Sequence, residues 1–314
     1  MSAAVACASP PASEPPAADL DATWERATAK ALRAHRSDRK GDLIIAESNY
    51  EKALAAATSF PEGDPRLLET QYALARLHRK QGRYDLAIRE LAALAPEQVR
   101  LHGASSEAVV ATLLTLCGAR VDAGLYEAGR EACLQVLTIQ EADAAVTATA
   151  IGATKLQLAD AERGLRRFDA AEDLYRSLLA QSPPGRASTA RAGVEVACHN
   201  GLGVLYTTQR RYSEAEPQHL KALSILVRHR SRESPVYAIV LRDLGDLYVK
   251  TRRYDDARER YDAALHGFEQ TLGKDHFQVR ETMLRIADLL ARTGKPREAA
   301  ELRYQAQAIP DPRT

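Results

Sequence analysis

Two segments of the sequence, GLGVLYTTQRRYSEAE at residues 201–216 and LGDLYVKTRRYDDARERYDAAL at 244–265, follow the same order of residue types. In both, a leucine precedes a glycine, a tyrosine stands nine residues after that glycine, and an alanine follows three residues later. A polar turn with two arginines comes directly before each tyrosine. Apolar residues on both sides of the turn recur at helical spacing, so each segment is predicted to form two helices joined by a tight turn.

The aromatic residue of this unit recurs along the chain at a nearly constant interval. The spacings are 42, 42, 44 and 42 residues between Tyr84, Tyr126, Phe168, Tyr212 and Tyr254. The same turn returns at Pro296 without the aromatic residue, and an earlier copy surrounds Leu43. A constant period in this range is typical of arrays of helix pairs. The sequence therefore predicts seven pairs, near 19–60, 65–97, 105–141, 143–181, 188–230, 234–272 and 275–309.

Small residues occupy two fixed places in each unit. Nine residues before the aromatic position stand Ala75, Cys117, Ala159, Gly203, Gly245 and Ala287. Three residues after it stand Ala87, Gly129, Ala171, Ala215, Ala257 and Ala299. Two antiparallel helices approach closely only where both present small side chains, so these positions are predicted to be the contacts within each pair.

These residues resemble the tetratricopeptide repeat, and the resemblance covers residues 19–309. The 42-residue period and the segment LGKDHFQV at 272–279 are similar to the long-repeat subclass seen in kinesin light chains and many bacterial proteins. The resemblance implies an all-α fold, a right-handed superhelical solenoid of about seven tetratricopeptide-like helix pairs. Because each pair packs only on its neighbours, the terminal pairs are expected to act as caps. The family implies a non-enzymatic interaction scaffold or adaptor.

Composition and motifs agree with a protein that is not an enzyme. Lys and Arg number 43 and Asp and Glu 42, so the net charge is +1 and no basic excess points to nucleic acid. No sequence run is apolar enough for a transmembrane helix, and no HExxH, CxxC or nucleophile-elbow motif occurs. We therefore expect no catalytic residue, no cofactor and no metal site. Cys117 and Cys133 are interpreted as core residues, with a disulfide between them left open for an exported protein.

By resemblance to the family, an extended peptide or partner protein would bind in a concave groove lined by the first helix of each pair. Carried over by position, the groove residues are Tyr72, Arg76, Arg79, Lys80, Leu114, Val121, Asp160, Arg163, Asn200, Val204, Arg242, Asp246 and Asp288. The alternative is that these charges are solvated surface or pair with each other, as Arg242 with Asp246 or Asp160 with Arg163.

Two sets of basic residues stand out. Arg76, Arg79 and Lys80 are like charges one helical turn apart, and no acidic residue stands three or four positions from Arg76. This cluster is predicted to attract an acidic or carboxy-terminal peptide, with solvated surface as the alternative. Arginine pairs also precede the aromatic residue at 166–167, 210–211 and 252–253. They are interpreted as solvated turns that offset a helix dipole, with a basic ridge as the alternative.

The ends of the chain differ from the repeats. Residues 1–18 are Ala- and Pro-rich and are predicted to be a disordered tail or tether, and 310–314 a second disordered tail. The sequence as written predicts a cytoplasmic protein. The alternative is a bacterial envelope lipoprotein acylated at Cys7, because Ala4-Val5-Ala6-Cys7 resembles the end of a lipoprotein signal if the true start lies upstream. Two other functions stay open, a self-associating assembly factor and a peptide-sensing regulator.

Overall fold

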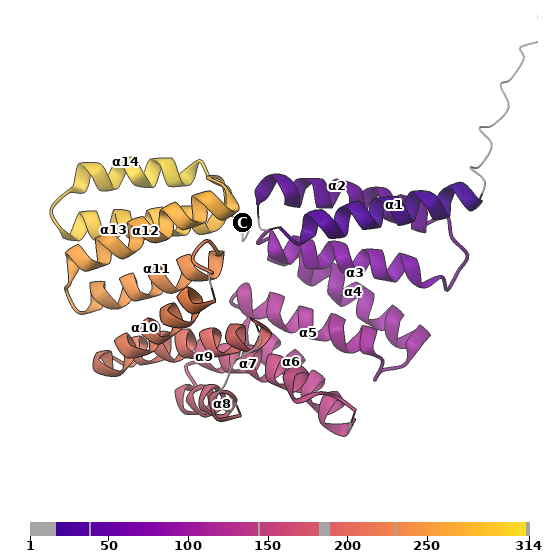
Figure 1. Ribbon diagram of the computed structural model, residues 1–314, viewed down its shortest axis with the longest axis horizontal. Helices are drawn as coiled ribbons and strands as arrows, with labels where there is room; N and C mark the ends of the chain where they lie inside the picture. Colours follow the sequence, from indigo (N-terminus) through magenta and orange to yellow (C-terminus); the bar gives the residue numbers. More distant parts are fainter. Residues whose placement is uncertain (1–16, 38, 144, 182–188, 230, 312–314) are drawn as a thin grey trace, which may run out of the picture.

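The computed structural model describes residues 17–37, 39–143, 145–181, 189–229 and 231–311. Every regular element in these ranges is an α-helix, and the fourteen helices form seven antiparallel pairs. Their bounds are α1 Ala17–His35, α2 Lys40–Ala57, α3 Pro65–Lys80, α4 Tyr84–His102, α5 Glu107–Asp122, α6 Tyr126–Ala142, α7 Ala148–Gly164, α8 Phe168–Ala180, α9 Thr189–Thr208, α10 Tyr212–Arg228, α11 Pro235–Lys250, α12 Tyr254–Leu272, α13 Phe277–Arg292 and α14 Pro296–Gln307. The pairs stack in chain order around an arc, so the predicted all-α solenoid is confirmed (Figure 1). We number the pairs as repeats one to seven.

The second repeat is longer than its sequence predicts. The sequence predicts the end of this pair at residue 97, directly after Pro96, but α4 continues to His102, and Gly103 with a φ of 83° follows it. A proline inside a helix lacks an amide donor and crowds the carbonyl four residues earlier. Buried Leu91, Leu94 and Gln98 hold this helix against its neighbours on both sides of the proline, and tertiary packing outweighs the local defect. Cys7 and most of the predicted tails lie outside the described residues.

The small residues of the repeat lie where the two helices of a pair touch, as predicted. Ala75, Cys117 and Ala159 have no exposed surface. Gly203 and Gly245 allow a closer approach still, because a β-carbon on Gly203 would lie 2.6 Å from the ring of His219. The partner side chain therefore packs directly on the helix backbone at these positions.

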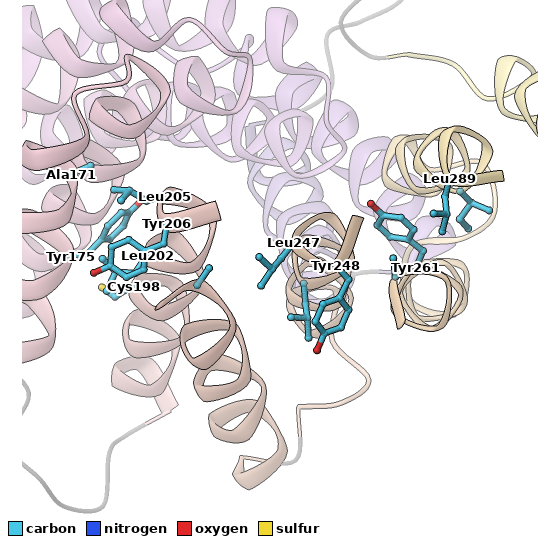
Figure 2. Close-up of a cluster of buried hydrophobic side chains, with 14 of the residues drawn as sticks. Ala171, Tyr175, Cys198, Leu202, Leu205, Tyr206, Leu247, Tyr248, Tyr261 and Leu289 are labelled. Carbon is cyan, nitrogen blue, oxygen red and sulfur yellow. The ribbon is translucent and has the colours of Figure 1, made fainter. Parts of the chain in front are cut away.

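The largest core cluster runs through the second half of the array, from α7 to α14. In Figure 2, Tyr175 of α8 lies beside Leu202 and Leu205 of α9, and all three are buried. Further along the same cluster, Tyr261 of α12 is only 2% exposed. Repeats four to seven thus all contribute side chains to one cluster that no single helix pair could form alone.

Ion pairs link consecutive repeats on the turn side. In repeats two, four, five and six, the residue just before the second helix is an arginine that reaches a glutamate of the preceding repeat. Arg211 bonds Glu172 at 2.8 Å, and Arg253 bonds Glu216 at 2.9 Å. In the three arginine pairs at 166–167, 210–211 and 252–253, this residue is the second arginine. One arginine of each pair therefore has a structural role.

The two ends of the array meet. The last repeat, α13 and α14, faces α2 across the open side of the arc (Figure 1). Phe277 at the start of α13 contacts Tyr84 with ring centroids 5.9 Å apart, and a β-carbon on Gly82 would lie 2.5 Å from its ring. A cavity of about 280 Å³, lined partly by Ile44 and Pro310, separates the two ends beside this contact. The solenoid therefore curves almost into a closed ring.

Candidate functional site

The main concavity is a groove of about 1150 Å³ on the inner side of the second half of the arc. The first helices of repeats three to seven line it, which are α5, α7, α9, α11 and α13. Seven of the residues predicted from sequence line this groove: Asp160, Arg163, Asn200, Val204, Arg242, Asp246 and Asp288. Its wall also includes apolar side chains, among them Val236 and Ile239.

Two carboxylates of the groove, Asp160 and Asp246, are held by buried tyrosines. We refer to these two residues and Asn200 as the groove floor. Tyr175 donates its hydroxyl to Asp160 at 2.6 Å, and Arg163 lies 3.1 Å from the same carboxylate. Burial alone would lower the pKa of Arg163, but the nearby Asp160 outweighs it and the pKa is raised. Asp160 and Arg163 therefore pair with one another, which agrees with the alternative of mutual pairing.

The same arrangement recurs in repeat six. Tyr261 donates its hydroxyl to Asp246 at 2.5 Å, and burial raises the pKa of this tyrosine above its ordinary value. Asp246 also pairs with Arg285 of the next repeat at 3.3 Å. A carboxylate on the first helix of a pair is thus fixed by the second helix and by the neighbouring repeat.

Arg242 does not pair with Asp246, contrary to one of the sequence alternatives. Its guanidinium donates to Gln278 of α13, and its Nε lies 3.8 Å from Asp243 Oδ1. Its side chain is 11% exposed, and burial lowers its pKa despite the nearby carboxylates. Helix geometry alone favoured Asp246, the residue four positions later. The folded array instead places two other acceptors near the guanidinium, Asp243 next in sequence and Gln278 of the next repeat.

Asn200 is fixed from two sides in the centre of the groove. Its Nδ2 donates to Asp243 Oδ2 at 2.7 Å, and its Oδ1 lies 2.9 Å from His219 Nδ1. His219 has no exposed surface, and burial lowers its pKa. A neutral imidazole donating from Nδ1 accounts for this contact and holds the amide in one orientation.

The other predicted groove residues lie outside this cavity: Tyr72, Arg76, Arg79, Lys80, Leu114 and Val121. The expectation that the basic cluster has no acidic neighbour is wrong for Arg79, whose Nε lies 2.8 Å from Asp122 Oδ2. Lys80 donates to the backbone carbonyls of His35 and Ser37 at 2.9 Å each. The acidic partner belongs to the next repeat, 43 residues away, where a search along one helix cannot find it.

The remaining members of this set have structural contacts. Arg76 stacks over Tyr72, with its guanidinium carbon 5.5 Å from the ring centroid, and the Tyr72 hydroxyl lies 3.0 Å from Thr115 Oγ1. Val121 is 9% exposed, and Leu114 is half-buried. Tyr72, Arg79 and Lys80 thus contact neighbouring repeats, and none of these predicted residues lines the main cavity.

The burial of His35 beside the basic cluster makes the stability of the chain depend on pH. Burial, followed by Lys80 and Arg76, lowers the pKa of His35 from 6.5 to about 4. Unfolded chains bind this proton below pH 6.5 and the folded chain does not, so stability is expected to fall as pH drops from 6.5 towards 4. Replacing His35→Gln should make this decline shallower. Urea unfolding at a series of pH values measures it, and parallel curves for both proteins would contradict the prediction.

Sequence reasoning missed several groove residues. Asp243 and Arg285 stand two positions before the small residue of their repeats and line the groove, as does Asp122 at the end of α5. The repeat register could have found the first two, because it places the same position of every first helix on one face.

No group of three metal-ligating side chains gathers in the described part of the chain. Among the described helices, none is both long and apolar enough to cross a membrane.

The tetratricopeptide-repeat family profile matches residues 38–92, 195–270 and 236–310. Among curated relatives, kinesin light chain-related protein 1 of Arabidopsis thaliana is 28% identical over 271 residues, 82% of this chain and 42% of the relative. Kinesin light chain-related protein 3 of the same plant is 31% identical over 153 residues, 48% of this chain and 22% of the relative. The chain therefore spans less than half the length of these relatives.

Solved structures share the architecture at low sequence identity. The apo form of RapI has a TM-score of 0.66 at 13% identity, with coverage of 93% of this chain and 97% of that chain. The apo quorum sensor NprR from B. thuringiensis has a TM-score of 0.59 at 12% identity, with coverage of 92% and 87%. A tetratricopeptide repeat protein from Parabacteroides merdae has a TM-score of 0.56 at 14% identity, with coverage of 92% and 93%. At these identities the similarity concerns the fold alone.

Proposed function

The chain belongs to the tetratricopeptide-repeat family, and we propose that it is a non-enzymatic scaffold that binds an extended segment of a partner protein in the groove of repeats three to seven. The observation that carries the proposal is the groove itself, about 1150 Å³ with a fixed polar floor and an open apolar wall. Pockets for small molecules are commonly about 300–1,000 Å³. A groove above that range suits a peptide better than a metabolite.

The floor supports recognition of a peptide backbone and its side chains. The Asn200 amide and the Asp160 and Asp246 carboxylates are held in place by other side chains, so a ligand meets groups that are already ordered. Pre-ordered groups lose little conformational entropy on binding. Val236 is 45% exposed on the wall and can contact an apolar side chain of the ligand.

An apolar-to-charged substitution on the wall tests the proposal. Peptides are first selected from a random library on the immobilised wild-type protein. Val236→Glu is then expected to weaken the selected peptides about tenfold, roughly 1.4 kcal/mol, because it places a charge where an apolar side chain would be buried. Leu220 of α10 lies outside the groove and is 48% exposed, so Leu220→Glu is the matched control. Equal affinities for the two variants would exclude this groove as the binding site.

The alternatives from the sequence stay predictions. Sedimentation of the purified chain tests self-association through the terminal repeats. Detergent partitioning of the native protein, compared with Cys7→Ser, tests acylation at Cys7. A peptide-sensing regulator would use the same groove, so the selected peptides address that function as well.

A further inference from the structure

The five described carboxylates that line the groove are all bound within the chain. Three of them lie in its centre and contact the tyrosine, asparagine and arginine side chains described above. Asp122 of α5 pairs with Arg79 at 2.8 Å. Asp288 of α13 pairs with Arg303 at 2.7 Å. The chain itself therefore compensates the negative charges of the groove.

The cations that line the groove fall into two sets. Three arginines take part in the contacts at its centre. Three other cations line the same groove, are exposed, and form no ion pair with any described residue: Arg210, Lys250 and Arg292. We refer to these three residues as the cationic edge.

Four positions along the chain from each member of the cationic edge stands a carboxylate that is bound elsewhere. These carboxylates are Glu214, Asp246 and Asp288. Each forms an ion pair with an arginine outside the cationic edge, at 2.7, 3.3 and 2.7 Å respectively. The chain therefore leaves the cationic edge without a local counter-ion.

The cationic edge lies at one end of the first helices. Lys250 and Arg292 are the last residues of α11 and α13, and Arg210 lies just beyond the end of α9. All three therefore lie beside the turn of their own helix pair. Val236, the second residue of α11, lines the groove at the opposite end of that helix. The groove wall is thus apolar at the start of α11 and cationic at its end.

The length of α11 sets the distance between these two features. A helix advances about 1.5 Å per residue, so Val236 and Lys250 are about 21 Å apart along the axis of α11. An extended chain advances about 3.3–3.6 Å per residue. A segment that lies along α11 therefore brings residues about six positions apart onto Val236 and Lys250.

We propose that the cationic edge binds a carboxylate of the segment that occupies the groove, about six residues from the apolar side chain that contacts Val236. The inference rests on the proposed function and names the chemistry of its ligand. An incoming carboxylate gains ion pairs there without displacing any that the chain already makes. An acidic side chain and a free carboxy terminus present the same chemistry, and the test below separates them.

A peptide fits this arrangement better than a nucleic acid. The centre of the groove carries Asp160, Asp243 and Asp246. A nucleic acid has a negative charge on every nucleotide, so phosphates beyond the cationic edge would face these carboxylates. A peptide can place one carboxylate at the cationic edge and uncharged residues along the rest of α11.

Removal of the three charges tests the proposal. The edge variant carries Arg210→Gln, Lys250→Gln and Arg292→Gln. The probes are the peptides selected on the wild type, labelled with fluorescein and made in three forms: with a free carboxy terminus, with an amidated one, and with each acidic side chain replaced by its amide. Anisotropy titrations at about 0.05 M and about 0.2 M salt give the affinities, because exposed charges are screened over about a Debye length.

The selected peptides are expected to carry a carboxylate about six residues from an apolar residue. The edge variant should bind them about fivefold more weakly than the wild type at the lower salt, and the difference should shrink at the higher salt. The form that lacks the relevant carboxylate should bind both proteins equally, which identifies the carboxylate as terminal or side-chain.

The matched control carries Arg89→Gln, Arg228→Gln and Arg297→Gln, which remove three exposed arginines outside the groove. It changes the net charge equally and should keep wild-type affinity. Selected peptides without such a carboxylate, equal binding by the wild type and the edge variant, or an equal loss in the control would overturn the proposal. If the peptides still lose affinity with Val236→Glu, the proposed function stands without the cationic edge. Failure to select any peptide would contradict the proposed function itself.

Discussion

A leucine in place of Gly245 is expected to lower the free energy of unfolding by about 1–3 kcal/mol. A β-carbon at this position would lie 2.6 Å from Tyr261 Cε1. Tyr261 cannot turn aside cheaply, because it is 2% exposed and its hydroxyl is bound to Asp246. The larger side chain must therefore separate α11 from α12 or break the contact that orders the groove floor.

Urea unfolding followed by circular dichroism measures this loss, with Gly193→Leu as the control. Gly193 also lies within a helix, but a β-carbon there would meet nothing within 4 Å. The control should be neutral or more stable, because glycine inside a helix costs about 1 kcal/mol relative to a good helix former. Equal losses for the two variants would show that close packing at Gly245 does not matter.

Reduction of the disulfide between Cys117 and Cys133 is expected to lower the free energy of unfolding by about 3 kcal/mol. The bond joins α5 to α6, the two Cα atoms are 5.4 Å apart, and the cysteines are separated by 16 residues. A crosslink that closes a loop of this length restricts the unfolded chain, and this accounts for most of the expected effect in the chain-entropy description.

Denaturation with and without reductant, on the wild type and on Cys117→Ala with Cys133→Ala, provides the measurement. The oxidised wild type should be the most stable form, and the reductant should change the wild type only. Cys198, the buried free cysteine among the described residues, is present in both proteins and controls for effects on other thiols. If the reductant leaves the free energy of unfolding of the wild type unchanged, the disulfide is contradicted.

The sequence by itself predicted the repeat register, because the steric rule that sets it is local. Two small residues twelve positions apart form one contact between adjacent helices, as where a β-carbon on Gly129 would lie 3.4 Å from the Cys117 carbonyl oxygen, and both residues are visible in a single segment. The short turn fixes the partner of each helix, so the seven pairs follow from spacing alone. Pro96 is the exception: its local preference favoured a helix end, and packing across α4 outweighed it.

The candidate groove could be predicted only in part. Register placed Asn200 and Asp246 on the inner face, but their partners come from elements that sequence spacing does not relate to them. The i,i+4 spacing favoured an ion pair between Arg242 and Asp246. In the structure, Arg242 instead donates a hydrogen bond to Gln278, and Asp246 pairs with Arg285. Charge pairs between repeats depend on the distance between side chains about 40 residues apart, which no helical periodicity encodes.

Only the tertiary structure decided which basic residues are compensated. Arg79 looked uncompensated in its own helix, yet it pairs with Asp122 of the next repeat. The second arginine of each pair at 166–167, 210–211 and 252–253 reaches back to a glutamate, while the first has no such partner among the described residues. The curvature that brings Phe277 onto Gly82 and Tyr84 is likewise a tertiary result, because small rotations between successive repeats add up over the whole array.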